Sequence, residues 1–324
     1  MDNERLKVVL TRRWPEAVER ELEQIFDVSL RQEDGPMSRD ELSQALKEAD
    51  ILCPTVTDRI EGDMLRDPQV RVRLIANFGV GFNHIDVAAA AERNISVTNT
   101  PGVLTQATAE IAMTLILTCA RRTGEGERLV RSGKWQGWPP THMLSTQVSG
   151  KVLGIVGMGR IGIALARMAH HGFGMQILYF GRSEVAPEVA AELGAARVSL
   201  EALLGQSDFV SLHCPATPET HHLINADNLA CMQPHAFLIN TARGDVISEA
   251  DLADALAGGG IAGAGLDVYE SEPTVHHALY ECPQAVLLPH MGSGTLQTRE
   301  AMGRCALHNM QALLAGQALP NKVV

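Results

Sequence analysis

The stretch GIVGMGRIG at residues 154–162 is the clearest indication of the fold of this chain. It continues a strand-like run, KVLGIV at 151–156, and leads into a segment with apolar residues on one helical face. These apolar residues are Ile161, Ala164, Leu165, Met168 and Ala169. A strand, a glycine-rich turn and a helix in this order are typical of the first unit of a dinucleotide-binding domain. We expect the helix to end at Gly172, because glycine commonly terminates helices.

The three glycines of this turn have separate physical roles. Gly157 allows the tight turn, Gly159 lets the backbone approach a pyrophosphate, and Gly162 lets the helix pack closely on the strand. Arg160 and Ile161 begin the helix, where free N–H groups and the helix dipole favour an anion. These five residues are therefore expected to bind the pyrophosphate of a dinucleotide.

The next predicted strand indicates which dinucleotide is bound. It ends at Gly181, Arg182 and Ser183, where an NAD-specific site usually places a carboxylate, about 20 residues beyond the glycine turn. Without a carboxylate there is no repulsion of a 2′-phosphate, and the guanidinium of Arg182 can bind one. The sequence therefore favours NADP over NAD. The alternative is that Arg182 is a solvated surface residue and that both cofactors are accepted.

Strand-like and helical segments alternate along all 324 residues, which predicts an α/β protein with parallel sheets. At roughly 100–200 residues per domain, two domains are expected. The predicted strands are 7–10, 49–53, 73–76, 176–179, 209–213, 236–240, 263–267 and 285–288. The predicted helices include 15–25, 38–48, 107–121 and about 295–314. No strand follows the last helix, so we expect it to pack back on the first domain.

Composition excludes several other classes of protein. The net charge of −11 disfavours a nucleic-acid-binding surface, which would be basic. The six cysteines are scattered without a C-x-x-C pair, so we expect buried thiols in a reducing compartment and no metal site. The longest apolar run, 111–120, is too short to span a bilayer, and the charged N-terminus does not resemble a signal peptide. We expect a cytoplasmic protein.

Three residues in the last third of the chain could perform hydride-transfer chemistry on a keto acid. Arg243 follows the predicted strand AFLIN, Glu272 lies in GLDVYESEP, and His290 lies in PHMGS. Such a reaction needs a cation for the substrate carboxylate, an acid for the developing alkoxide and a partner for that acid. All three follow predicted strands, at the edge where open α/β sheets bind ligands.

These motifs together identify a family resemblance that covers nearly the whole chain. The chain resembles the D-isomer-specific 2-hydroxyacid dehydrogenases in NFGVGFNHID (77–86), GMGRIG (157–162), NTARGD (240–245), GLDVYESEP (265–273) and PHMGS (289–293). The resemblance implies two doubly wound parallel-sheet domains. A Rossmann NADP-binding domain, residues 102–292, would be inserted in a flavodoxin-like substrate domain made of residues 1–101 and 293–324.

The resemblance also implies roles for five residues. Arg243 would bind the substrate carboxylate and polarise the keto oxygen. His290 would donate the proton in reduction, and Glu272 would pair with it, fix its tautomer and keep it protonated. The backbone N–H groups of Val80 and Gly81 would hold the other carboxylate oxygen.

Further cofactor contacts are implied by the same resemblance. Thr108 and Asp267 would border the nicotinamide, and Cys214 and Pro215 would line the adenosine pocket. The other residues expected at the cofactor are Thr241, Ala242, Arg243, His290, Gly292 and Ser293.

The resemblance allows a choice among members of the family. Glu272 stands where formate dehydrogenases carry Gln, so formate is disfavoured as the substrate. Val80 stands where phosphite dehydrogenases carry Lys, so phosphite is also disfavoured. The segment GKWQGW at 133–138 is similar to glyoxylate/hydroxypyruvate reductases, in which the second Trp reaches the partner subunit's active site. Trp138 would then limit substrate size in a homodimer, although burial at a dimer contact would explain it equally well.

The expected activity is NADPH-dependent reduction of glyoxylate, hydroxypyruvate or a similar small 2-keto acid to the D-2-hydroxy acid. Two alternatives remain open. One is a reductase of a bulkier 2-keto acid such as phenylpyruvate. The other is a dinucleotide-sensing binding protein without catalysis, for which an acidic residue at Gly181 and long disordered tails would be expected.

Overall fold

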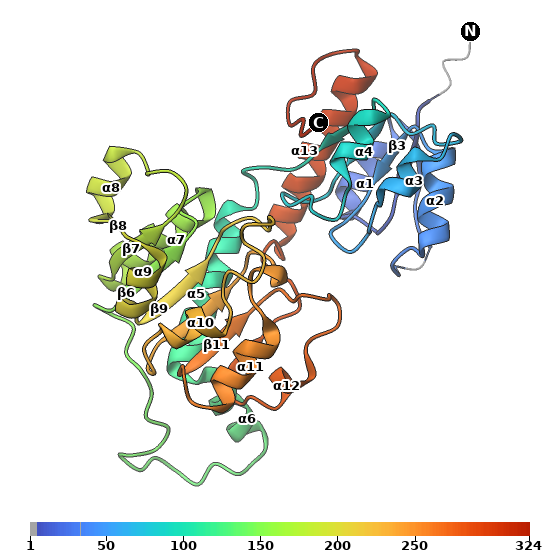
Figure 1. The fold of residues 1–324 in the computed structure, drawn as a ribbon. Coiled ribbons are helices and arrows are strands. Elements are labelled where there is room, and N and C mark those ends of the chain that lie inside the picture. Colours follow the sequence, from blue (N-terminus) through green and yellow to red (C-terminus); the bar gives the residue numbers. More distant parts are fainter. Residues whose placement is uncertain (1–4, 33) are drawn as a thin grey trace. The chain divides into compact units, whose positions relative to one another are not determined.

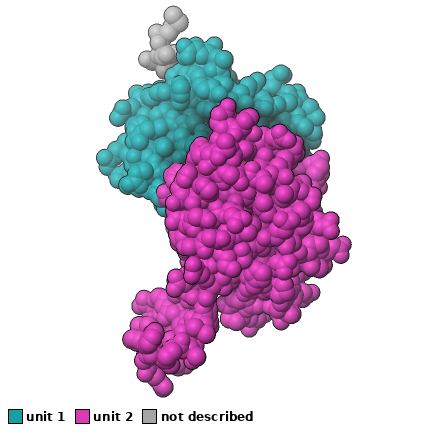
Figure 2. Space-filling view, turned by 90° about the vertical axis from the view of Figure 1, so that its left-hand side faces the viewer, with its two compact units in different colours: residues 1–104, 293–324 teal, residues 105–292 magenta. Residues whose placement is uncertain are grey.

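A computed structural model describes residues 5–32 and 34–324 and divides them into two compact units (Figures 1 and 2). Unit 1 holds the described residues up to Leu104 together with Ser293–Val324, drawn in teal in Figure 2. Unit 2 holds Thr105–Gly292, drawn in magenta. The first boundary therefore falls after Leu104, whereas the sequence places it after Pro101.

Unit 1 is built on a parallel five-stranded sheet in the order β2-β1-β3-β4-β5. The strands are β1 (Lys7–Leu10), β2 (Asp27–Ser29), β3 (Ile51–Cys53), β4 (Leu74–Ala76) and β5 (Ser96–Thr98). The helices are α1 (Glu16–Glu23), α2 (Arg39–Glu48), α3 (Gly62–Arg66), α4 (Val87–Glu92) and α13 (Leu296–Leu314). This is the flavodoxin-like strand order, as the family resemblance implies.

Alternate residues of these strands build two apolar layers, because successive side chains of a strand point to opposite faces. Val9 packs in a cluster with residues of α2, α3 and α4, whereas Val8 packs in a cluster with residues of α1 and α13. The last helix therefore does return to the first unit. It approaches α1 closely, since a Cβ added at Gly303 would lie 2.8 Å from a methyl carbon of Val18.

Unit 2 is built on a parallel seven-stranded sheet in the order β12-β11-β10-β9-β6-β7-β8. The strands are β6 (Val152–Val156), β7 (Gln176–Phe180), β8 (Ala196–Arg197), β9 (Phe209–Leu212), β10 (Phe237–Asn240), β11 (Gly263–Leu266) and β12 (Ala285–Leu287). The order reverses between β6 and β9, which is the Rossmann pattern. The prediction of two parallel-sheet α/β domains is confirmed.

Helices cover both faces of this second sheet. The apolar cluster on one face contains residues of α5 (Thr105–Arg121), α7 (Arg160–Phe173) and α8 (Pro187–Leu193). The cluster on the other face contains residues of α9 (Leu200–Gln206), α10 (Ala226–Ala230), α11 (Glu249–Ala257) and α12 (His277–Tyr280). Helix α6 (Thr123–Arg131) and a long irregular segment leading to β6 extend from the end of α5 (Figure 1).

The structure corrects two details of the sequence analysis. Helix α7 ends at Phe173 and is capped by Gly174, which has a φ of +61°, and Gly172 lies inside the helix. Cys231 is exposed rather than buried, while Cys53, Cys119 and Cys282 are buried as free thiols.

Two features are absent from residues 5–32 and 34–324. No cluster of His, Cys, Asp and Glu suited to a metal ion occurs among them. None of the helices that they form combines the length and apolar character needed to cross a bilayer.

Candidate active site

The glycine turn after β6 has the geometry that a pyrophosphate site requires. Gly157 has a φ of +96°, and a Cβ added there would lie 2.6 Å from the backbone nitrogen of Cys214. A Cβ on Gly162 would lie 2.6 Å from the carbonyl oxygen of Gly157, whereas a Cβ on Gly159 would meet no atom within 4 Å. Glycine at 157 and 162 is therefore needed by the fold, and Gly159 faces open space.

Helix α7 begins directly at this open space. Its N-cap is Gly159, which has no side chain to cap the first N–H groups of Arg160 and Ile161. Exposed N–H groups at a helix N-terminus favour an anion. The turn fits the pyrophosphate of a dinucleotide.

The first three residues after β7 include one basic side chain and no carboxylate. Gly181, Arg182 and Ser183 follow Phe180, the last residue of β7. Arg197 of the neighbouring β8 donates hydrogen bonds to the carbonyl oxygens of Gly181 (2.8 Å) and Arg182 (3.2 Å). Arg197 therefore fixes the backbone of this segment, and its charge is paired with Glu184 at 3.6 Å.

Arg182 also influences the loop that follows β9. A hydrogen bond from Thr217 and, more weakly, the charge of Arg182 lower the pKa of Glu219 in that loop. The loop begins with His213, Cys214 and Pro215, and the backbone of Cys214 touches Gly157. The structure thus places the predicted adenosine-side residues around the carboxyl ends of β6, β7 and β9.

His290 and Glu272 form a direct pair. Nδ1 of His290 lies 2.7 Å from Oε2 of Glu272, and Oε1 of Glu272 accepts a hydrogen bond from the N–H of Tyr269 at 3.1 Å. Burial raises the pKa of Glu272, but the hydrogen bond and charge of His290, with smaller effects of Tyr269 and Arg243, outweigh it. The pKa of Glu272 therefore lies below its ordinary value, and the side chain is a carboxylate at neutral pH.

Arg243 lies on the turn after β10, which Asn240 shapes from both sides. The Asn240 side chain accepts a hydrogen bond from the N–H of Ala242 (3.0 Å) and donates one to the carbonyl oxygen of Arg243 (2.8 Å). Burial lowers the pKa of Arg243, and the charges of Glu272 and Asp245 oppose that effect. Because arginine keeps its proton in proteins, this is a partly desolvated cation near the Glu272–His290 pair.

Asp267 fixes the turn that carries His290. It is 1% exposed, and its two oxygens accept hydrogen bonds from the N–H groups of Met291 and Gly292, both at 2.7 Å. Burial raises the pKa of Asp267, and these hydrogen bonds and the charge of His290 oppose that effect only in part. Thr108 donates a hydrogen bond to the carbonyl oxygen of Gly292 at 3.2 Å. Thr108, Asp267 and Gly292 therefore lie together.

Thr241 carries a buried hydroxyl group on the turn after β10. Its hydroxyl oxygen is buried and has no hydrogen-bond partner among the residues that the structure describes. Buried polar groups are normally satisfied, so this hydroxyl is available to a bound molecule. Together with the Gly157–Gly162 turn, Thr241 shows that unit 2 fits a dinucleotide.

Val80 and Gly81 lie in unit 1, in the loop after β4. The carbonyl oxygen of Val80 accepts a hydrogen bond from Asn99, and that of Gly81 accepts one from Asn77, both at 2.9 Å. In a trans peptide the carbonyl and the N–H of the next residue point in opposite directions. The N–H of Gly81 is therefore directed away from Asn99. Ser293 also lies in unit 1, at its boundary.

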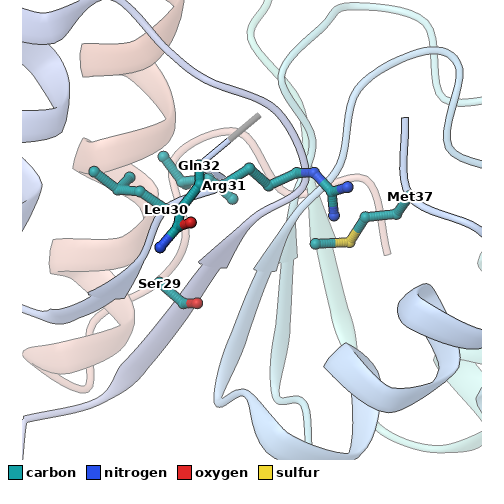
Figure 3. A pocket seen from close by; sticks show the side chains of 6 residues that line it. Ser29, Leu30, Arg31, Gln32 and Met37 are labelled. Atoms are coloured by element: carbon teal, nitrogen blue, oxygen red, sulfur yellow. The ribbon is translucent and has the colours of Figure 1, made fainter. Parts of the chain in front are cut away.

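Unit 1 also contains a pocket of about 320 Å³ (Figure 3). It lies at the carboxyl ends of β1 and β2, the sheet edge that also carries the loop after β4. Arg31 lines it and pairs with Glu41 at 3.2 Å, so its charge is already met within the unit. The pocket is lined by Leu10, Ser29, Leu30, Arg31, Gln32 and Met37.

Comparison with known proteins decides the family. Residues 113–292 match the sequence profile of the D-isomer specific 2-hydroxyacid dehydrogenase NAD binding domain. The chain belongs to this family. A glyoxylate reductase from Thermococcus litoralis is 44% identical over 321 residues, which cover 98% of this chain and 96% of the relative. One from Pyrococcus furiosus is 42% identical over 321 residues, covering 98% and 95%.

Solved structures of the 2-hydroxyacid dehydrogenase family share the fold. An NADPH-dependent glyoxylate/hydroxypyruvate reductase from Sinorhizobium meliloti, in complex with NADP and malonate, is 31% identical with a TM-score of 0.85. The match covers 99% of this chain and 97% of that one. A glyoxylate reductase from Paecilomyes thermophila is 32% identical with a TM-score of 0.86, covering 98% of each chain. The chain is thus a member of an oxidoreductase family along its whole length.

Several residues that support this candidate site cannot be recognised from the sequence. Asn240 lies in the NTARGD motif, but the motif does not reveal that its side chain shapes the turn of Arg243. Arg197 lies on a strand of only two residues, too short to be recognised from its pattern. Glu249 begins helix α11 and resembles an ordinary acidic residue in a first helical turn.

Proposed function

We propose that this chain is an NADPH-dependent reductase of a small 2-keto acid, glyoxylate or hydroxypyruvate, which it converts to the D-2-hydroxy acid. The observation that carries the proposal is the Glu272–His290 pair at 2.7 Å with the partly desolvated cation of Arg243 beside it. The glyoxylate reductases that match the chain over most of their length support the substrate class.

Each of the three side chains has a distinct task in this reaction. Arg243 binds the substrate carboxylate with its planar fork and draws electron density from the keto oxygen. Glu272 faces Nδ1 of His290, so Nε2 is the ring nitrogen that delivers the proton to the developing alkoxide. The N–H groups of Val80 and Gly81 hold the second carboxylate oxygen.

NADPH supplies the hydride to the keto carbon when it is bound. Gly157, Gly159, Arg160, Ile161 and Gly162 hold its pyrophosphate. At the 2′-phosphate the donors are Arg182 and Ser183, with Gly181 leaving room. Thr108 and Asp267 border the nicotinamide. The other contacts are Cys214, Pro215, Thr241, Ala242, Arg243, His290, Gly292 and Ser293.

The enzyme acts as a homodimer in this proposal. Helix α6 and the segment after it expose Val130 (60%), Trp135 (53%), Trp138 (79%) and Leu144 (69%). Exposed apolar side chains that gather in one segment are typical of an interaction surface. Trp138 would extend to the partner subunit's active site and limit the size of the substrate.

The test is the initial rate of glyoxylate-dependent cofactor oxidation, measured with NADPH and with NADH at equal concentrations. Faster oxidation of NADPH supports the proposal, and faster oxidation of NADH contradicts the cofactor assignment. Hydroxypyruvate is run in parallel, because its product is chiral, and only D-glycerate agrees with the proposal. Turnover of phenylpyruvate but of neither small acid would instead assign a bulkier substrate. Binding of NADPH without turnover of any 2-keto acid would assign a sensor.

A further inference from the structure

Glu249 connects helix α11 to the chain segment that carries Glu272. It is the first residue of α11 and is 4% exposed. Its Oε1 accepts a hydrogen bond from the N–H of Glu270 at 2.8 Å, and its Oε2 accepts one from the N–H of His276 at 2.9 Å. A single carboxylate therefore holds both ends of the segment 270–276, and His276 is also the N-cap of α12, which lies beside α11 (Figure 1).

The Glu270 carboxylate also bonds to the backbone of Glu249. Its Oε2 accepts a hydrogen bond from the N–H of Glu249 at 3.2 Å, and its Oε1 bonds to Nε2 of His222. The backbone N–H of His222 donates a hydrogen bond to the carbonyl oxygen of Asp245 at 2.8 Å. The segment is thus joined to the start of α11 and, through His222, to the turn that follows Arg243.

That turn also touches the segment directly. A Cβ added at Gly244 would lie 1.8 Å from the carbonyl carbon of Tyr269 and 2.2 Å from the backbone nitrogen of Glu270. Only glycine permits this approach of two backbones. The residue after Arg243 is therefore packed against the start of the segment that Glu249 holds.

Glu272 lies inside the held segment. The N–H of Thr274 donates to the carbonyl oxygen of Ser271 at 2.8 Å, which closes a turn around Glu272. From this turn the Glu272 carboxylate meets His290 at 2.7 Å. Because the segment is fixed at both ends, the position of its ends determines where Glu272 lies.

We propose that Glu249 is a positioning residue for catalysis, whose buried carboxylate fixes the segment 270–276 so that Glu272 meets His290. This inference rests on the proposed function. Glu249 acts through Glu272 and has no direct role in binding substrate or cofactor.

A carboxylate is the side chain that this role requires. It has two acceptor oxygens for two backbone N–H groups, whereas the amide of glutamine has one acceptor and a donor that faces the second N–H. Glu249→Gln therefore removes one of the two contacts with little change in volume. One end of the segment is released, and a small misplacement of a catalytic group is costly.

The test is a double-mutant cycle with Glu249→Gln and Glu272→Gln in the full chain. If Glu249 acts through Glu272, E249Q lowers kcat about tenfold in the wild-type background and less than about twofold in the E272Q background. The Kd of NADPH, measured by its fluorescence, stays unchanged. Glu201→Gln is the matched control, because Glu201 also follows a serine N-cap, in the first turn of α9, and is exposed. E201Q is expected to leave kcat unchanged.

Three results of the cycle would overturn the inference. They are an equal loss of kcat in both backgrounds, no loss in either, or a loss accompanied by weaker NADPH binding. If E249Q does not fold, Glu249→Asp replaces it, since aspartate keeps the charge with a shorter reach. The loss of kcat caused by Glu249→Asp must likewise vanish in the E272Q background.

A second measurement needs no substrate and separates this inference from the proposed function. The Glu272 carboxyl group is titrated by ¹³C NMR in the wild type and in E249Q. We expect its pKa to be higher in E249Q, because the favourable contact with His290 is weakened. Identical Glu272 titrations would overturn the inference. Absence of 2-keto acid turnover in the wild type, with the titrations still different, would contradict only the proposed function.

Discussion

Oε2 of Glu272 lies 2.7 Å from Nδ1 of His290, while Oε1 of the same carboxylate accepts the N–H of Tyr269 at 3.1 Å. Both oxygens are therefore engaged, and the carboxylate is held in one orientation. Asp267 fixes the backbone on the other side of His290 by accepting the N–H groups of Met291 and Gly292. Two acids with separate tasks therefore act on His290: the partly buried Glu272 faces its ring, and the buried Asp267 holds the turn that carries it.

Glu272 should contribute stability that depends on pH. Its pKa is lowered in the folded chain from an ordinary value of 4.5, so the unfolded chain binds the proton more readily. The contribution is present above the ordinary value and is lost as the pH falls through the folded value. We expect E272Q to unfold more easily than the wild type in urea at pH 6.5, with the difference shrinking below pH 4.5. If the difference in stability between the wild type and E272Q grew as the pH fell, the lowered pKa of Glu272 would be contradicted. E281Q is the control, because Glu281 is exposed.

Arg243→Lys should be a poor replacement, although it keeps the charge. Lysine cannot form the paired hydrogen bonds that a guanidinium offers a carboxylate. We expect kcat/KM for glyoxylate to fall between about tenfold and hundredfold, the range for losing a hydrogen bond to a charged group. NADPH binding is measured by fluorescence to show that the cofactor site survives. Arg304→Lys, on the exposed side of α13, is the control, and equal effects of the two changes would refute the role of Arg243.

Arg182→Ala should change the response to the two cofactors differently. The 2′-phosphate is present only in NADPH, so we expect its KM to rise about tenfold, while that of NADH changes less than about twofold. Arg197→Ala should act in the same direction, since Arg197 holds the carbonyl oxygens of residues 181 and 182. Arg167→Ala, an exposed site on α7, is the control. Equal losses with NADPH and NADH would show that Arg182 does not contact a 2′-phosphate.

Alanine substitutions in the glycine turn after β6 should affect stability at Gly162 and NADPH binding at Gly159. Gly162→Ala places a Cβ 2.6 Å from a backbone oxygen and should lower the free energy of unfolding by about 1–3 kcal/mol. Gly159→Ala meets no protein atom within 4 Å and should leave the melting temperature nearly unchanged while weakening NADPH binding. Calorimetry with and without NADPH checks both. A destabilised G159A with normal NADPH affinity would contradict the assignment of this turn.

Much of the fold was predictable because it depends on local patterns. Strands such as β6 are continuous buried apolar runs bounded by turn residues, and Gly157 and Gly162 occupy positions that no larger residue can take. Helix ends were less certain, since Gly172 and Gly174 both follow the apolar face of α7 and only Gly174 adopts the left-handed conformation.

The site was predictable only where motifs lie at strand ends. Arg243, Glu272 and His290 each follow a strand, and the structure brings Glu272 and His290 together. The supporting contacts of Arg197 and Glu249 join residues far apart in the chain, as when Glu249 meets His276. Such pairs arise from tertiary packing, which no local pattern in the sequence records.

The most direct test of the account is glyoxylate-dependent NADPH oxidation by the wild type and by His290→Asn, with NADPH affinity measured on both. We expect rapid oxidation by the wild type and a loss of about 10²- to 10⁴-fold in kcat for H290N, the range for a general acid, with unchanged NADPH affinity. His308→Asn, at an exposed position of α13, should keep full activity. An H290N variant that retains wild-type turnover would show that His290 is not the proton donor.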